Sequence, residues 1–112
     1  MHLPSAVEAL SALGHGHRLA VFRLLVKAGE LGLPAGEIAR EVGVLSNTLS
    51  THLTILDRAG LIRSRRDGRS VIYAADYEGI RTLIAFLVAD CCNGRPEICA
   101  PLAGLMQACQ PK

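Results

Sequence analysis

The chain has 112 residues, half of them apolar, which is enough for one small domain with a hydrophobic core of its own. The net charge of +2 excludes a strongly acidic or basic chain, and the absence of Trp favours aliphatic packing between helices. The longest apolar run, Leu83 to Ala89, is far shorter than the ~20 residues of a membrane-spanning helix. No secretory signal is visible, so we expect a cytoplasmic protein with reduced cysteines and no membrane partner.

The first 45 residues predict three helices. A capping box in "SAVE" opens a helix that runs from Ser5 toward Leu13. An apolar segment over 17–28 predicts a second helix, which ends where a glycine follows. Pro34 suits the first turn of a third helix, and Gly43 ends it.

A fourth helix is expected after only two intervening residues, with Ser46 as its cap. Leu49, Leu53 and Leu56 form an apolar stripe at spacings i, i+4 and i+7. The opposite face carries short polar side chains and one arginine: Asn47, Ser50, Thr51, Thr54 and Arg58. Two short helices joined by a Gly-containing turn, with a polar outer face on the second, are the helix-turn-helix pattern.

A β-hairpin with clustered arginines is expected next. Asp67-Gly68 lies between the runs "LIRSRR" and "SVIYAA", which is a signal for a tight hairpin. Residues 46–75 hold five arginines and two aspartates, a local balance of +3. Such a local excess of basic charge suits contacts with phosphate, although a solvated face is the plainer alternative. Helices and hairpin together predict a mainly α fold with a small β-hairpin wing, a winged helix-turn-helix.

This arrangement predicts which side chains contact DNA. Groove contacts are expected from the fourth helix, at Asn47, Thr48, Ser50, Thr51 and Thr54. Wing contacts are expected from Arg65, Arg66 and Arg69. His52 lies between the two faces of the helix and is expected to make a structural or phosphate contact. His15 and His17 have no cysteine or carboxylate nearby at ligand spacing, so they are expected to be polar surface residues.

The last long helix, from Asp76 or Tyr77 onward, carries an apolar stripe that nothing after it is long enough to cover. The stripe consists of Ile80, Leu83, Ile84, Leu87 and Val88. An uncovered stripe of this kind, together with the short helix at the N-terminus, predicts a homodimer, whose two recognition helices would meet a palindromic operator. We therefore assign residues 1–92 to DNA binding and dimerisation, and residues 93–112 to a C-terminal segment and tail.

The order of these elements and the core "STHLTILDRAGL", Ser50 to Leu61, resemble the ArsR/SmtB family of bacterial metal- and metalloid-responsive repressors. The resemblance extends over residues 5 to 92. It implies a dimer that represses a resistance operon, leaves DNA when an inducer binds, and has no enzymatic activity.

The resemblance also suggests where an inducer binds. One class in this family has a Cys-x-Cys pair before the recognition helix, and that region here has no cysteine. Another class binds zinc through a histidine on the last helix, whereas the last histidine here is His52. The segment "CCNGRPEIC" instead resembles the arsenite-responsive subgroup, which implies Cys91, Cys92 and Cys99 as ligands and makes residues 93–112 the inducer-binding segment.

Thiol chemistry agrees with this assignment, because As(III) and Sb(III) are soft and take three sulfur ligands. Zinc or cadmium would favour a fourth ligand, for which Cys109 in the tail is available. Three alternatives stay open. Cys91 and Cys92 continue the apolar stripe and could be packing residues; the thiols could sense oxidants or persulfides; or the protein could be a zinc- or cadmium-type sensor. Catalysis is disfavoured because no Gly-rich anion-binding loop surrounds the thiols.

Overall fold

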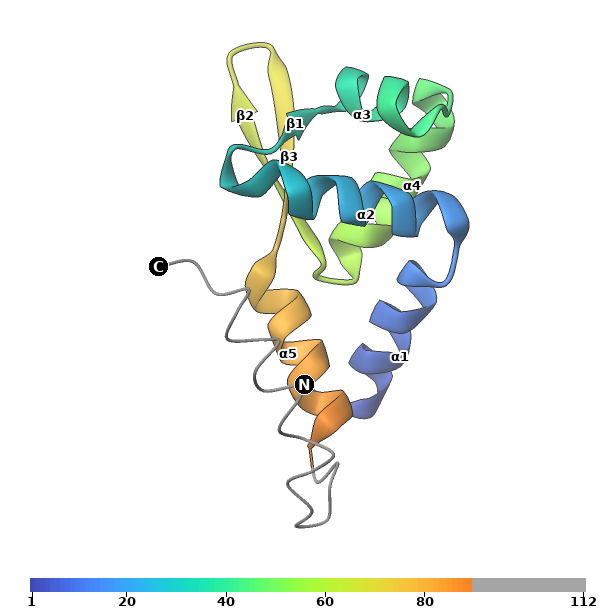
Figure 1. The fold of residues 1–112 in the computed structure, drawn as a ribbon, viewed down its shortest axis with the longest axis vertical. Helices are drawn as coiled ribbons and strands as arrows, with labels where there is room; N and C mark the ends of the chain where they lie inside the picture. The colour runs from blue at the N-terminus through green and yellow to red at the C-terminus, as the bar shows by residue number, and fades with distance from the viewer. Residues whose placement is uncertain (90–112) are drawn as a thin grey trace.

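The computed structural model describes residues 1–89, so the four cysteines lie outside the described residues. In chain order the elements are α1 (Leu3–Leu13), α2 (Gly16–Ala28), η1 (Gly29–Leu31), β1 (Leu33–Pro34), α3 (Ala35–Val42), α4 (Ser46–Arg58), β2 (Ile62–Asp67), β3 (Ser70–Ala75) and α5 (Tyr77–Val88). Figure 1 shows α1 and α5 converging at one end of the molecule, with the hairpin at the other. No helix in the part that the structure describes is long and apolar enough to cross a membrane.

The sheet has three antiparallel strands in the order β1-β3-β2. Strands β2 and β3 form the predicted hairpin, paired from Ile62↔Ala75 to Asp67↔Ser70. The turn therefore consists of Gly68 and Arg69, one residue later than predicted, and Gly68 supplies its positive φ of 64°. The two-residue strand β1 was not predicted, because a strand this short that contains a proline has no period to detect. The predicted fold class, mainly α with a small hairpin wing, is confirmed.

Three helix starts differ from the prediction. Helix α1 begins at Leu3 rather than Ser5, because the His2 side chain caps it by accepting a hydrogen bond from the Ser5 backbone N–H at 3.3 Å. Helix α2 likewise begins one residue early, at Gly16, after the capping residue His15. Ser46 is not a cap: it is the first residue of α4, and Leu45 in extended conformation precedes it.

The core forms where the apolar faces of these elements meet. The predicted stripe of α4 is confirmed, since Leu49, Leu53 and Leu56 are all buried. The inner face of α1 is built from alanines, which let α1 pack closely. The remaining buried core side chains are Val21, Phe22, Leu25, Ile38, Leu61, Ile62, Ala75 and Leu83. The core thereby fixes α4 against α1, α2 and α3 and leaves its polar face outward.

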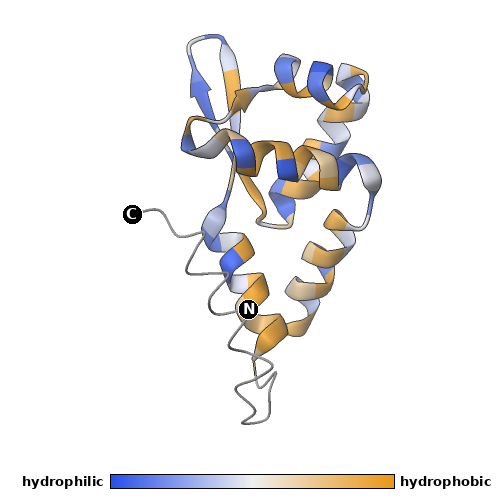
Figure 2. Ribbon diagram, viewed as in Figure 1, coloured by the Kyte–Doolittle hydropathy of each residue, from blue (hydrophilic) through white to orange (hydrophobic). Residues whose placement is uncertain are grey.

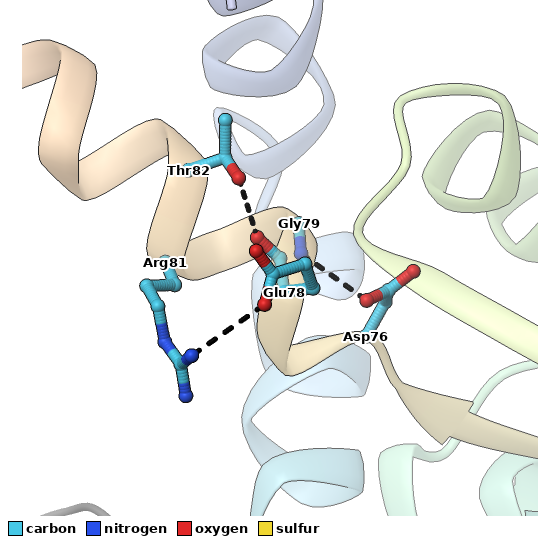
Figure 3. Close-up of polar contacts among 5 residues, drawn as sticks. All are labelled: Asp76, Glu78, Gly79, Arg81 and Thr82. Carbon is cyan, nitrogen blue, oxygen red and sulfur yellow. Dashed lines mark hydrogen bonds and ion pairs between the residues drawn. The ribbon is translucent and has the colours of Figure 1, made fainter.

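The start of α5 is fixed by a capping bond (Figure 3) and by a close contact with the backbone of Gly60. The Asp76 carboxylate accepts a hydrogen bond from the Gly79 N–H at 3.1 Å, as an N-cap residue does. A Cβ at position 79 would overlap the backbone oxygen of Gly60, the second residue after α4. A residue without a side chain is therefore required here, and α5 begins at a defined point beside the end of α4.

Helices α1 and α5 are rich in apolar residues at the end of the molecule away from the hairpin (Figure 2). Several of their large apolar side chains are exposed. On α1 the large residues face solvent while Ala6, Ala9 and Ala12 face the core. On α5, Leu87 is 51% exposed, whereas Leu83 is 2% exposed and belongs to the core of the single chain. The exposed apolar residues of the two helices are Leu3, Val7, Leu10 and Leu87.

Candidate nucleic-acid interface

The turn between α3 and α4 brings the two helices together. Gly43 ends α3 in the left-handed conformation, with φ 79° and ψ 38°, and its N–H donates to the carbonyl of Ala39. Only Val44 and Leu45 lie between this glycine and α4, as predicted. The chain thus forms the helix-turn-helix, with α4 in the position of the recognition helix (Figure 1).

The polar face of α4 lies open to solvent along its whole length. Two of its groups are already engaged within the helix: the Thr54 hydroxyl donates to the Ser50 carbonyl at 2.9 Å, and the Asn47 side-chain oxygen accepts from the Thr48 N–H at 2.9 Å. The structure places all five predicted groove residues on the exposed surface: Asn47, Thr48, Ser50, Thr51 and Thr54. Their arrangement supplies donors and acceptors on one surface, and their contact with DNA stays a prediction.

The hairpin places the three predicted wing arginines in two different settings. Arg66 and Arg69 are exposed near the turn. The guanidinium of Arg65 instead donates to the backbone carbonyls of Glu30, at 3.3 Å, and Leu31, at 2.8 Å. Arg65 therefore ties the wing to η1, a structural bond that its sequence position did not indicate.

His52 differs from its neighbours on α4. Its side chain is only 7% exposed, which leaves little surface for the phosphate contact that the sequence suggested. Its pKa lies below the ordinary value, because burial disfavours the imidazolium and because His15, Arg18 and His17 lie nearby. His15 and His17 are exposed as predicted, but the structure brings them beside His52. The signal missed in the sequence was the His-x-His spacing ahead of a buried histidine.

A recognition helix with an open polar face, next to a hairpin that carries arginines, defines a winged helix-turn-helix DNA-binding protein. A helix-turn-helix domain family matches residues 13–65. The HTH-type transcriptional regulator YgaV of Escherichia coli is 34% identical over 82 residues, which are 73% of this chain and 81% of YgaV.

Two solved structures share the fold. One is the homodimeric winged helix-turn-helix DNA-binding domain of Mb0332 from Mycobacterium bovis, a possible ArsR-family regulator, with 26% identity and a TM-score of 0.64 over 80% of this chain and 82% of that one. The other is a "possible transcriptional regulator for arsenical resistance", with 29% identity and a TM-score of 0.63 over 71% of this chain and 80% of that one. The chain belongs to the ArsR-type family of winged helix-turn-helix transcriptional regulators.

Proposed function

We propose that this regulator is a metalloid-responsive repressor. It binds a palindromic operator as a homodimer and leaves it when As(III) or Sb(III) is bound by the thiolates of Cys91, Cys92 and Cys99. The observation that carries the proposal is three cysteines within nine residues, directly after the helix that adjoins the exposed apolar surface of the DNA-binding domain.

The DNA-binding part of the proposal rests on α4 and the wing. The polar face of α4 offers hydrogen-bonding groups to base edges, and the arginines near the hairpin turn offer charge to phosphates. Residues 46–75, which contain both α4 and the hairpin, have a net charge of +3, whereas the whole chain has a net charge of +2. Attraction to DNA is therefore concentrated on the surface where the recognition helix is exposed.

The dimer part rests on the apolar surface at the opposite end. Helix α1, which exposes large apolar side chains, contacts α5, which exposes Leu87. Such a patch marks an interface more often than a free surface. The similar Mb0332 domain is homodimeric, which supports a homodimer here.

The inducer part rests on chemistry and on position in the chain. Three thiolates without histidine suit a soft, three-coordinate metalloid better than zinc. The cysteine segment follows α5 within a few residues, so a ligand bound there acts on the helix next to the proposed interface. A coupling of about 1–3 kcal/mol between inducer and operator changes DNA affinity by roughly 5- to 150-fold.

The proposal is tested by fluorescence anisotropy with a labelled duplex that the purified protein selects from random-sequence DNA. Under reductant, arsenite and antimonite should release the duplex, and zinc should not. If peroxide releases it and arsenite under reductant does not, the thiols are a redox sensor. If zinc or cadmium alone releases it, the protein is a divalent-metal sensor.

A further inference from the structure

Three histidines from two distant parts of the sequence meet at the start of α2. His15 is the N-cap of α2, His17 lies in its first turn, and His52 projects from α4. The ring centroids of His15 and His52 are 4.7 Å apart, and His17 lies 5.6 Å from His15 and 5.7 Å from His52. One ring nitrogen from each comes within 4.8 Å of the other two. These three residues are the histidine cluster.

The histidine cluster contains an unsatisfied polar atom. Nδ1 of His52 is buried and has no hydrogen-bond partner in the described part of the chain. A buried ring nitrogen without a hydrogen-bond partner is uncommon in folded proteins, and a bound ligand would satisfy it. The neutral form of an imidazole is the form that binds metals.

The geometry lies close to that of a tetrahedral metal site. Zn–N bonds of about 2.0–2.1 Å place neighbouring ligand nitrogens roughly 3.3 Å apart. The nitrogens of the cluster must therefore close by at most about 1.5 Å from their largest separation of 4.8 Å. His15 and His17 are exposed, whereas His52 is buried, so the closure falls mainly to the two exposed rings.

One hydrogen bond must be exchanged when a metal binds. Nδ1 of His15 accepts the backbone N–H of His17 at 3.2 Å, and this bond caps α2. A neutral imidazole has a single nitrogen lone pair, so His15 cannot cap the helix and ligate a cation at once. When a cation occupies the histidine cluster, the bond from His15 to the metal therefore replaces the capping hydrogen bond of α2.

From this geometry we infer that the histidine cluster is a three-imidazole site for a divalent cation of the zinc class, separate from the cysteine segment. Imidazole nitrogens suit zinc, cobalt, nickel and copper, and three of them leave a fourth position for water or an anion. Arg18, which donates to the Ala12 and Ser11 carbonyls at 2.7 and 3.4 Å, lies near His52 and favours an anion there. A cation in the cluster joins the start of α2 directly to the recognition helix.

The test is a titration with Co²⁺ and Zn²⁺ of the full chain in which all four cysteines are replaced by serine. We expect one Co²⁺ per chain, with the visible absorption bands of a tetrahedral nitrogen site and no sulfur charge-transfer band. Zn²⁺ should displace the Co²⁺ and raise the melting temperature.

Matched variants identify the ligands. His15→Asn removes an imidazole but keeps a capping side chain, and His17→Ala removes an exposed ring; each should weaken Co²⁺ binding by roughly 10- to 100-fold or more. His2→Asn makes the same change at the cap of α1 and should leave binding unchanged. If the chain binds no Co²⁺, or if His15→Asn and His17→Ala bind as tightly as the parent, the inference is wrong. Neither DNA nor arsenite enters this test, so its failure leaves the proposed repressor function unaffected.

Discussion

At the scale of single residues, Gly79 shows how little room the fold leaves where α5 starts. Its backbone passes directly against the Gly60 carbonyl, which is why the second residue of the "EGI" segment has no side chain. Nothing in the sequence pattern singled out this glycine, because the contact joins two segments that are close only in the folded chain.

We predict that Gly79→Ala lowers the free energy of unfolding by about 1–3 kcal/mol or more, because the added methyl group must displace rigid backbone. Gly36→Ala is the matched control, since a Cβ there meets no atom of the described residues within 4 Å and alanine has the higher helix propensity in α3. Urea unfolding followed by circular dichroism measures both. Equal stability of the two variants would contradict the close contact.

Arg66 and Arg65 carry the same charge on neighbouring positions and have different surroundings. Because Arg65 bonds to the carbonyls of η1, part of its contribution is structural, whereas Arg66 is exposed near the turn. The sequence predicted both as DNA contacts, since spacing along a strand does not reveal which guanidinium finds a carbonyl in the fold.

We predict that Arg66→Ala weakens binding to all DNA sequences alike and reduces the slope of log K against log salt by about 1, the loss of one phosphate contact. Arg81→Ala removes the same charge from α5, where Arg81 forms only an exposed pair with Glu78 at 3.5 Å, and should leave the slope unchanged. Anisotropy titrations at several salt concentrations measure the slopes. An unchanged slope for Arg66→Ala would show that the wing does not contact phosphate.

At the scale of elements, hydrophobic period and glycine position predicted the helices well, and capping predicted their first residues poorly. Helices α4 and α5 and the β2–β3 hairpin were predicted correctly because each prediction depended on a pattern of several residues. Helix starts depend on one side chain each, and an imidazole served as the cap of both α1 and α2 where a serine or no cap was expected. Strand β1 escaped prediction because it exists only by pairing with β3.

The cap of α5 gives a test at this scale. We predict that Asp76→Ala lowers the free energy of unfolding by about 1 kcal/mol, because the Gly79 N–H loses its acceptor. Asp76→Asn keeps an acceptor and should retain most of the stability. Thermal unfolding of the two variants decides the matter, and equal losses would mean that the carboxylate charge, rather than the cap, stabilises the helix.

At the scale of the whole molecule, the sequence predicted an arginine-rich wing and an apolar stripe on the last helix. The structure places the hairpin at one end of the molecule and brings α1 and α5 together at the other (Figure 1). The predicted dimer stripe lay on the last helix alone. In the structure Leu83 of that stripe is buried within one chain, while α1 adds exposed apolar side chains that the sequence did not name as interface residues. Which residues of an apolar helix face the core depends on packing between helices. The hydrophobic period alone therefore could not separate the core residues of α5 from its exposed residues.

We predict that Leu10→Glu and Leu87→Glu each shift the protein toward monomers, because a charge in an apolar interface is costly. DNA affinity should fall with the loss of the second recognition helix. Leu31→Glu changes a residue that is 80% exposed on η1 and should leave the oligomeric state unchanged. Sedimentation velocity measures the masses, and dimers that persist in both α1 and α5 variants would place the interface elsewhere.

The central claim, that thiols after α5 control DNA binding, is tested most directly by adding arsenite to the protein–DNA complex under reductant while anisotropy is recorded. We predict that the parent protein and the Cys109→Ser control lose roughly 5- to 150-fold in affinity. The variants Cys91→Ser, Cys92→Ser and Cys99→Ser should each remain bound to DNA. Release of all three variants by arsenite, at the concentrations that release the parent, would contradict the account.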